Sequence, residues 1–274
     1  MTTNSTDYGK AGRNLPAAIA VGLGLFTTLI ISLFADVRFF TLLVAFAAVL
    51  AIRELSQTLV VGLSQRMIIL LQIIAPVIVV AASLRGITGL VTAFLASVIF
   101  ILSVRLLDGE EAYVHHVTRS IFALVYVPVL ASFAVLLSTQ TDGAWKVLAL
   151  VLLTAATDLG GYVAGALFGK HPMAPKISPN KTWEGFAGAL VLQLVIGVLL
   201  WLYVFEQSWW EGAIVGFMMM LSATFGDLIE SMIKRDLGVK DMGSVLPGHG
   251  GVMDRLDSLV INSFVAWALF GIFL

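Results

Sequence analysis

The chain has 274 residues, of which 59% are hydrophobic and only 12% are charged, and its mean hydropathy is +0.99. This composition, with apolar runs of about 20 residues recurring along the chain, excludes an ordinary soluble domain. The absence of cysteine excludes disulfides, thiolate metal sites and a cysteine nucleophile, and the formal net charge of −1 says less than the distribution of the charges.

The hydropathy pattern predicts an all-α fold, a polytopic membrane bundle of about nine transmembrane helices. Each apolar run is long enough to cross ~30 Å of hydrocarbon as a helix that rises ~1.5 Å per residue. The expected spans are 16–34, 38–57, 67–84, 86–104, 117–138, 144–167, 185–205, 210–233 and 258–274.

The connections between these runs are too short to build a core of their own, so we expect one membrane-embedded domain. Along the chain it consists of a polar N-terminal tail (1–15), N-terminal transmembrane helices (16–143) and a C-terminal transmembrane region that carries the candidate catalytic loops (144–274).

The basic residues predict which end of the bundle faces the cytoplasm. Nine spans place most of the 16 Lys and Arg residues on one side, and only Arg38, Arg85 and Lys146 on the other. Because cytoplasmic loops are enriched in Lys and Arg, the richer side should be cytoplasmic, with the N-terminus inside and the C-terminus outside. Arg53 and Glu54, near the end of the second span, should lie at the interface or pair inside the bundle.

Two loops on the predicted cytoplasmic side differ from the others, and the first covers 169–185. Its prolines prevent a continuous helix, and Lys170, Lys176 and Lys181 make it positive. The pattern indicates a rigid basic loop that could hold phosphate. An ordinary positively charged cytoplasmic loop is the alternative explanation.

The second polar stretch, 226–258, contains six acidic and four basic residues in an otherwise apolar chain. Asp227, Glu230, Ser231 and Lys234 fall on one stripe of a helix, which cannot face lipid. Glu230 and Lys234 are spaced as a helix-stabilising pair. Asp227 has no such partner in its own helix, which favours a metal or substrate role for it.

A glycine-rich segment follows and leads into the last helix. Gly250 and Gly251 before a helix N-terminus make a phosphate-accepting backbone possible, and His249 between glycines favours a phosphate contact. If the two helix ends meet, Asp254 and Asp227 can bind Mg²⁺ together, because Mg²⁺ takes one or two carboxylates and completes its shell with water and phosphate oxygens.

Two further acidic residues are candidates with different alternatives. Asp158 lies near the cytoplasmic end of the sixth span, where an ionisable residue indicates function, and Gly160 and Gly161 after it allow close helix approach. Asp257 in the first turn of the last helix could instead only complement the helix dipole.

These residues resemble the phosphatidate cytidylyltransferases, also called CDP-diacylglycerol synthases, over roughly 154–258. The family's C-terminal signature corresponds to Ser231, Lys234, Arg235, Lys240, Asp241, His249, Gly250, Gly251, Asp254, Arg255 and Asp257. An upstream element of the family corresponds to Ser178, Pro179, Asn180, Lys181, Thr182, Glu184 and Gly185. The first ~150 residues show only membrane character.

The resemblance implies transfer of a cytidylyl group from CTP to phosphatidic acid, with CDP-diacylglycerol and pyrophosphate as products and Mg²⁺ as the cofactor. Our mechanistic hypothesis allows one or two metal ions. The predicted metal ligands are Asp227 and Asp254. The predicted catalytic residues are Asp227, Lys234, Arg235, Lys240, Asp241, His249, Asp254 and Arg255. The predicted substrate-binding residues are Asp158, Ser178, Asn180, Lys181, Thr182, Glu184, Ser231, Gly250 and Gly251.

The expected partners are CTP, phosphatidic acid and membrane lipid, with no nucleic acid, and a homodimer is expected on general grounds. We expect a multi-pass protein of the bacterial cytoplasmic (inner) membrane with its active site on the cytoplasmic side. Two alternatives remain. One is a nucleotide-using enzyme that acts on a polyprenol or another lipid phosphate, and the other is an ion-coupled transporter, since intramembrane carboxylates also mark ion paths.

Overall fold

The computed structural model describes residues 15–59, 63–243, 245 and 250–274, with side chains of the first helix from residue 21 onwards. The predicted all-α polytopic fold is confirmed. The helices are α1 (Leu15–Ala35), α2 (Val37–Leu59), α3 (Gln65–Leu106), α4 (Tyr113–Leu124), α5 (Leu130–Ser138), α6 (Gly143–Phe168), α7 (Trp183–Tyr203), α8 (Trp209–Asp236) and α9 (Met253–Phe273). A π-helical segment, Val125–Val129, joins α4 to α5 into one continuous rod.

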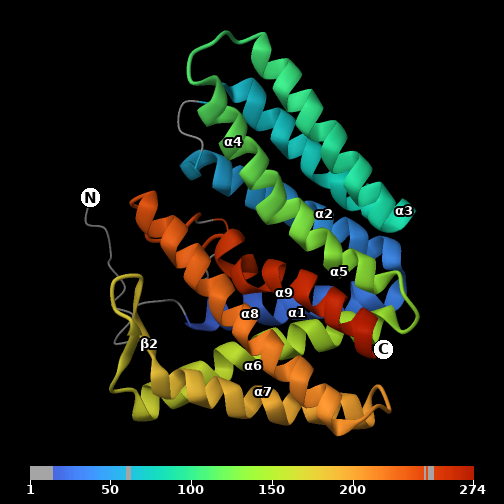
Figure 1. Ribbon diagram of the computed structural model, residues 1–274, viewed down its shortest axis with the longest axis vertical. Coiled ribbons are helices and arrows are strands. Elements are labelled where there is room, and N and C mark those ends of the chain that lie inside the picture. The colour runs from blue at the N-terminus through green and yellow to red at the C-terminus, as the bar shows by residue number, and fades with distance from the viewer. Residues whose placement is uncertain (1–14, 60–62, 244, 246–249) are drawn as a thin grey trace.

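Within the described residues, seven helices are long and apolar enough to cross a membrane, counting the α4–α5 rod as one. The 42-residue α3 contains a non-helical residue, Gly86, with φ +61°, a conformation that glycine adopts readily. Gly86 divides α3 into two segments that run in different directions (Figure 1). These segments correspond to the predicted spans 67–84 and 86–104, while the total of nine crossings stays a prediction.

Helix α9 occupies the middle of the bundle. In Figure 1 it lies between the group formed by α2 to α5 and the group formed by α6 to α8. It packs against α8, α5, α6 and α2, and so joins the two groups. Fully buried side chains such as Ile52, Leu124, Leu153, Trp201 and Phe270 form the core between them.

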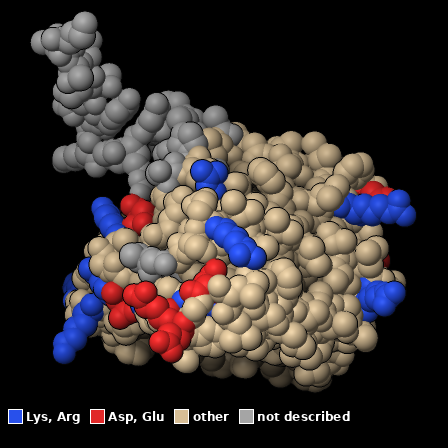
Figure 2. Space-filling view, turned by 90° about the horizontal axis from the view of Figure 1, so that it is seen from above, with Lys and Arg blue, Asp and Glu red and all other residues tan. Residues whose placement is uncertain are grey.

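Charged side chains are unevenly distributed over the surface. Figure 2 shows most of the Lys, Arg, Asp and Glu side chains in view on one half of the molecule and a smaller group at the opposite end, with uncharged surface between the two. Many large apolar side chains are exposed, including Leu84, Ile99, Val191 and Ile272. A surface of this kind is stable when hydrocarbon covers it, as in a membrane-spanning protein.

The predicted basic loop after α6 folds into a small antiparallel hairpin of β1 (Pro172–Ala174) and β2 (Ser178–Thr182). We predicted that its prolines would prevent a helix, which is confirmed, but we did not predict strands. Immediately after the hairpin the Thr182 side chain accepts a hydrogen bond from the Gly185 amide at 3.1 Å and caps α7. The hairpin is therefore tied directly to the start of a membrane helix.

Candidate active site

The hairpin is fastened to the end of α8 by two contacts. Arg235 donates a hydrogen bond from Nε to the carbonyl oxygen of Ile177 at 3.2 Å. Lys181 forms an ion pair from Nζ to Oδ2 of Asp227 at 2.5 Å. The two polar segments that the sequence singled out thus meet at one end of the bundle.

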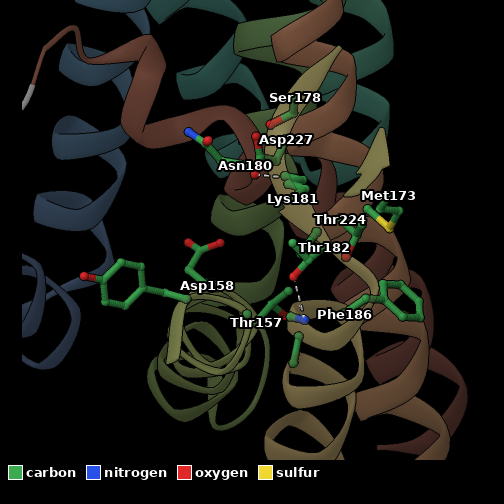
Figure 3. A pocket seen from close by; sticks show the side chains of 15 residues that line it. Thr157, Asp158, Met173, Ser178, Asn180, Lys181, Thr182, Phe186, Thr224 and Asp227 are labelled. Atoms are coloured by element: carbon green, nitrogen blue, oxygen red, sulfur yellow. Dashed lines mark hydrogen bonds and ion pairs between the residues drawn. The ribbon is translucent and has the colours of Figure 1, made fainter. Parts of the chain in front are cut away.

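A cavity of about 300 Å³ lies between α6, the hairpin, α7 and α8. Asp158 of α6, Asn180 and Lys181 of β2, and Asp227 of α8 are among its lining residues (Figure 3). The Lys181 and Asp227 side chains keep 21% and 34% of their surface exposed, so both remain accessible to a ligand. Apolar lining residues such as Phe186 complete a cavity with both polar and apolar walls.

The charges around this cavity act on one another. Asp257, Asp227, Lys181 and Arg255 are all near enough to Asp158 to interact with it electrostatically. Carboxylates and cations from α6, β2, α8 and α9 therefore share one region. Such a mixture suits a ligand that carries phosphate groups together with a metal ion.

A second group of polar side chains lies at the contact between α8 and α9 and is more buried than the first. Lys234 pairs with Oε2 of Glu230 and with Oδ1 of Asp254, both at 2.6 Å. The two carboxylates are buried, with 2% and 4% of their side-chain surfaces exposed. The helix-stabilising Glu230–Lys234 pair that the spacing predicted is thus present, and Asp254 extends it to α9.

Asp254 also holds the connection between α8 and α9. It accepts hydrogen bonds from the amide of Met242 at 3.1 Å and from the amide of Gly251 at 2.8 Å. Gly250 beside it has φ +87°, which favours glycine. The Gly251 amide, which we considered as a phosphate donor, is used by Asp254 instead.

The fit to Mg²⁺ differs between the two predicted ligands. Asp227 is partly exposed at the cavity, and Mg²⁺ needs only one or two protein carboxylates when phosphate and water complete its shell. Both oxygens of Asp254 already have protein partners, which favours a structural role. The described part of the chain holds no group of three or more His, Cys, Asp or Glu side chains placed to hold a metal ion.

The cavity brings together six of the predicted site residues, namely Asp158, Ser178, Asn180, Lys181, Thr182 and Asp227. Other predicted residues are not among those that line it. Ser231 contacts Asp227 at 3.5 Å, while Lys240 and Asp241 are exposed in the α8–α9 connection and Arg255 is exposed on α9. His249 lies outside the described residues.

Two predicted residues have roles within the protein. Glu184 accepts hydrogen bonds from the amides of Lys170 and His171 and pairs with the His171 ring at 2.5 Å, so it fastens the base of the hairpin. Asp257 accepts a hydrogen bond from the amide of Ser258 at 2.6 Å, but it lies beyond the first turn of α9, contrary to the helix-terminus alternative. These contacts leave their predicted roles untested.

Sequence reasoning gave no site role to Glu54, which holds the start of α9, or to cavity-lining residues such as Thr157 and Thr224. Glu54 of α2 is buried and accepts hydrogen bonds from the amides of Val252 and Met253 at the start of α9. The sequence predicted that Glu54 would lie at the interface or pair inside the bundle, but it gave Glu54 no role at the site. The signal was a carboxylate at the end of an apolar run, which must find partners inside the bundle.

Fold and site together define the class, a polytopic membrane protein with a charged cavity at one end of its helices. Residues 16–273 match the cytidylyltransferase family, and the chain belongs to that family. It is similar to the phosphatidate cytidylyltransferase of Mycobacterium leprae, with 39% identity over 285 residues that cover 98% of this chain and 91% of the relative. This confirms the resemblance seen in the sequence.

Other relatives carry the same name. The phosphatidate cytidylyltransferase of Mycobacterium bovis is 36% identical over 276 residues, which cover 96% of this chain and 90% of that protein. The one of Staphylococcus saprophyticus is 40% identical over 141 residues, or 51% of this chain and 54% of that protein.

Proposed function

We propose that the protein transfers the cytidylyl group of CTP to phosphatidic acid and forms CDP-diacylglycerol and pyrophosphate. The observation that carries this proposal is the similarity, over nearly the full length, to proteins named phosphatidate cytidylyltransferase at 39% and 36% identity. The position of the charged cavity supports it as well, because these substrates combine phosphate groups with acyl chains that stay in the membrane.

In the proposed reaction a phosphate oxygen of phosphatidic acid attacks the α-phosphorus of CTP. A new phosphorus–oxygen bond forms, and the bond from the α-phosphorus to the oxygen that bridges to the β-phosphorus breaks. Pyrophosphate leaves with that electron pair. The attacking oxygen is already anionic near neutral pH, so the protein need not supply a general base.

Catalysis then depends on positioning and on neutralising negative charge. Lys181 lies at the cavity and can exchange its partner Asp227 for a phosphate group. Arg255 is exposed on α9 and interacts with Asp158, which places a second cation near the same region. These two cations are suited to hold the phosphates of the two substrates.

We further propose that the reaction requires Mg²⁺ and that Asp227 holds it, with Asp158 facing the same cavity. A metal ion held there would supply positive charge that neutralises the phosphates. Asp254 remains a predicted ligand, although Lys234 and the amides of Met242 and Gly251 already use acceptor positions on both of its oxygens.

We place the site on the cytoplasmic side of a bacterial cytoplasmic membrane, because the predicted topology puts most Lys and Arg residues at the hairpin end. The organism of the Mycobacterium leprae relative supports only that the membrane is a bacterial one. A homodimer is also proposed, on the general ground that exposed membrane bundles often pair, and chemical cross-linking in membranes tests it.

The decisive experiment is incorporation of labelled CTP into lipid by the purified protein. We expect phosphatidic acid to be converted in the presence of Mg²⁺ and the rate to fall to background when the ion is removed by a chelator. Conversion of prenyl phosphates instead of phosphatidic acid would favour the alternative enzyme. Absence of any labelled lipid would contradict the proposal.

A further inference from the structure

Glu54, near the end of α2, lies against the start of α9, 198 residues further along the chain. Its side chain is buried, with 2% of the residue exposed. Oε1 accepts a hydrogen bond from the Val252 amide at 3.0 Å, and Oε2 accepts one from the Met253 amide at 2.9 Å. A carboxylate from the first half of the chain therefore meets the segment that carries the predicted signature.

The first turn of α9 depends on this contact because its own residues do not cap it. Val252 stands at the N-cap position and makes no side-chain capping bond. The first amides of a helix need acceptors, and a negative charge at that end also complements the helix dipole. Glu54 supplies from another helix the acceptors that a Ser or Asp at the cap would supply locally.

Two glycines allow the backbone to approach the Glu54 carboxylate. A Cβ at Gly243 would overlap it, and a Cβ at Gly251 would lie 2.6 Å from its Oε2. Asp254 binds the same two stretches of backbone, through the amides of Met242 and Gly251. The backbone at Met242–Gly243 and at Gly251 is therefore in contact with two carboxylates, that of Glu54 from α2 and that of Asp254 from α9.

We propose that Glu54 is a positioning residue for the transfer reaction, because it fixes the start of α9 and with it Asp254, Arg255 and Asp257. This proposal rests on the proposed function. A shift of the first turn of α9 would move Asp254 away from Lys234. It would also move Arg255 and Asp257, whose charges act on Asp158 at the cavity. Misplacement of reacting groups by about 1 Å can slow a reaction about 100-fold.

The first test is Glu54→Gln in the full-length protein. Glutamine keeps the size of the side chain but points an NH₂ group at one of the two amide donors. We expect kcat/KM for CTP to fall roughly tenfold and KM for CTP to rise, and a lower melting temperature because one buried amide loses its acceptor. A smaller amount of folded enzyme would lower the maximal rate but not change KM. A variant whose KM for CTP equals that of the native protein would therefore overturn the proposal.

Glu110→Gln is the matched control, because Glu110 is exposed in the α3–α4 connection, and it should behave as the native protein.

The second variant, Gly243→Ala, disturbs the same contact without changing α2. Its methyl group would overlap the Glu54 carboxylate, so we expect the same rise in KM for CTP. Gly271→Ala is its control, because a Cβ at Gly271 meets no atom within 4 Å. Native kinetics for Gly243→Ala would overturn the proposal even if Glu54→Gln did not fold.

Hydrogen exchange separates this inference from the proposed function, since it needs no substrate. In Glu54→Gln the amides of 251–254 should exchange about tenfold faster than in the native protein, with α3 and α7 unchanged. If the native protein does not label lipid, the proposed function is wrong, but the exchange experiment still tests whether Glu54 holds the start of α9. Unchanged exchange at 251–254 would overturn the positioning role even in an active enzyme.

Discussion

Asp227 and Asp254, the two carboxylates that the sequence treated alike, have different surroundings in the fold. Asp227 pairs with Lys181 at the cavity and is one-third exposed, with 34% of its side chain accessible, whereas Asp254 is enclosed with Lys234 and two amides. A partly exposed pair can exchange its partner for a ligand at small cost, but a buried charge cannot lose its partner without a large penalty. We infer that Asp227 binds the ligand and that Asp254 has a structural role at the site.

Asp227→Asn should lower kcat at least about 100-fold, because it removes the charge that faces Lys181 and the proposed metal ion. The melting temperature should change little, since Asp227 is partly exposed. Initial rates of CTP incorporation measure the effect, with Asp108→Asn in the exposed α3–α4 connection as the control. Turnover within threefold of the native rate would remove Asp227 from the catalytic set.

Lys234→Met should destabilise the fold by about 3 kcal/mol, because it leaves the buried carboxylates of Glu230 and Asp254 without their cation. Thermal or denaturant unfolding in detergent measures the loss. Lys240→Met, which removes an exposed lysine a few residues away, should leave the stability unchanged. Equal stability of the two variants would show that the Lys234 pairs contribute nothing to the fold.

At the scale of elements, the walls of the cavity depend on close packing of α6, α7 and α8. A Cβ at Gly160 would lie 2.8 Å from the carbonyl oxygen of Gly188, and a Cβ at Gly216 would lie 2.7 Å from that of Gln193. Small residues let membrane helices approach closely, and dispersion contacts then hold them together. The glycines of these helices therefore set the spacing on which the cavity is built.

Gly216→Ala should destabilise the protein by about 1–3 kcal/mol, because the added methyl group has no room between α7 and α8. Gly24→Ala in α1 is the matched control. Its Cβ meets no atom within 4 Å, so it should keep or slightly raise the stability. Unfolding midpoints in the same detergent compare the two, and an equal response would contradict the close contact.

At the scale of the whole molecule, the polar cavity, the hairpin and the start of α9 occupy one end of an apolar bundle. The sequence puts most of its basic residues in the loops of that end, which predicts that it faces the cytoplasm. A site at this level can take a water-soluble nucleotide from one side while the acyl chains of a lipid remain in the bilayer.

Cysteine labelling tests this orientation without background, because the chain contains no cysteine. Lys176→Cys at the exposed hairpin should react with an impermeant maleimide only after the membrane is opened. Gln207→Cys in the exposed α7–α8 turn should react in intact cells. Labelling of both positions from the same side would contradict the predicted topology.

Some of the site could be predicted because its residues are close in sequence. The stripe Asp227–Lys234 follows from helical spacing, and the hairpin residues follow from a proline-rich break between two apolar runs. Glu54 could not be assigned in this way, because nothing local indicates which of the other helices its carboxylate meets. The difference in burial between Asp227 and Asp254 could not be predicted either, because it also depends on partners that are distant in sequence.

By itself the sequence determined the membrane class, the positions of the helices and the residue types of the site, because hydrophobic runs and charge patterns act locally along a chain. Only the tertiary structure decided which charges are enclosed and which face the cavity. It joined α2 to α9 through Glu54 and β2 to α8 through Lys181. Burial and pairing are properties of neighbours in space, and in this protein those neighbours come from distant parts of the chain.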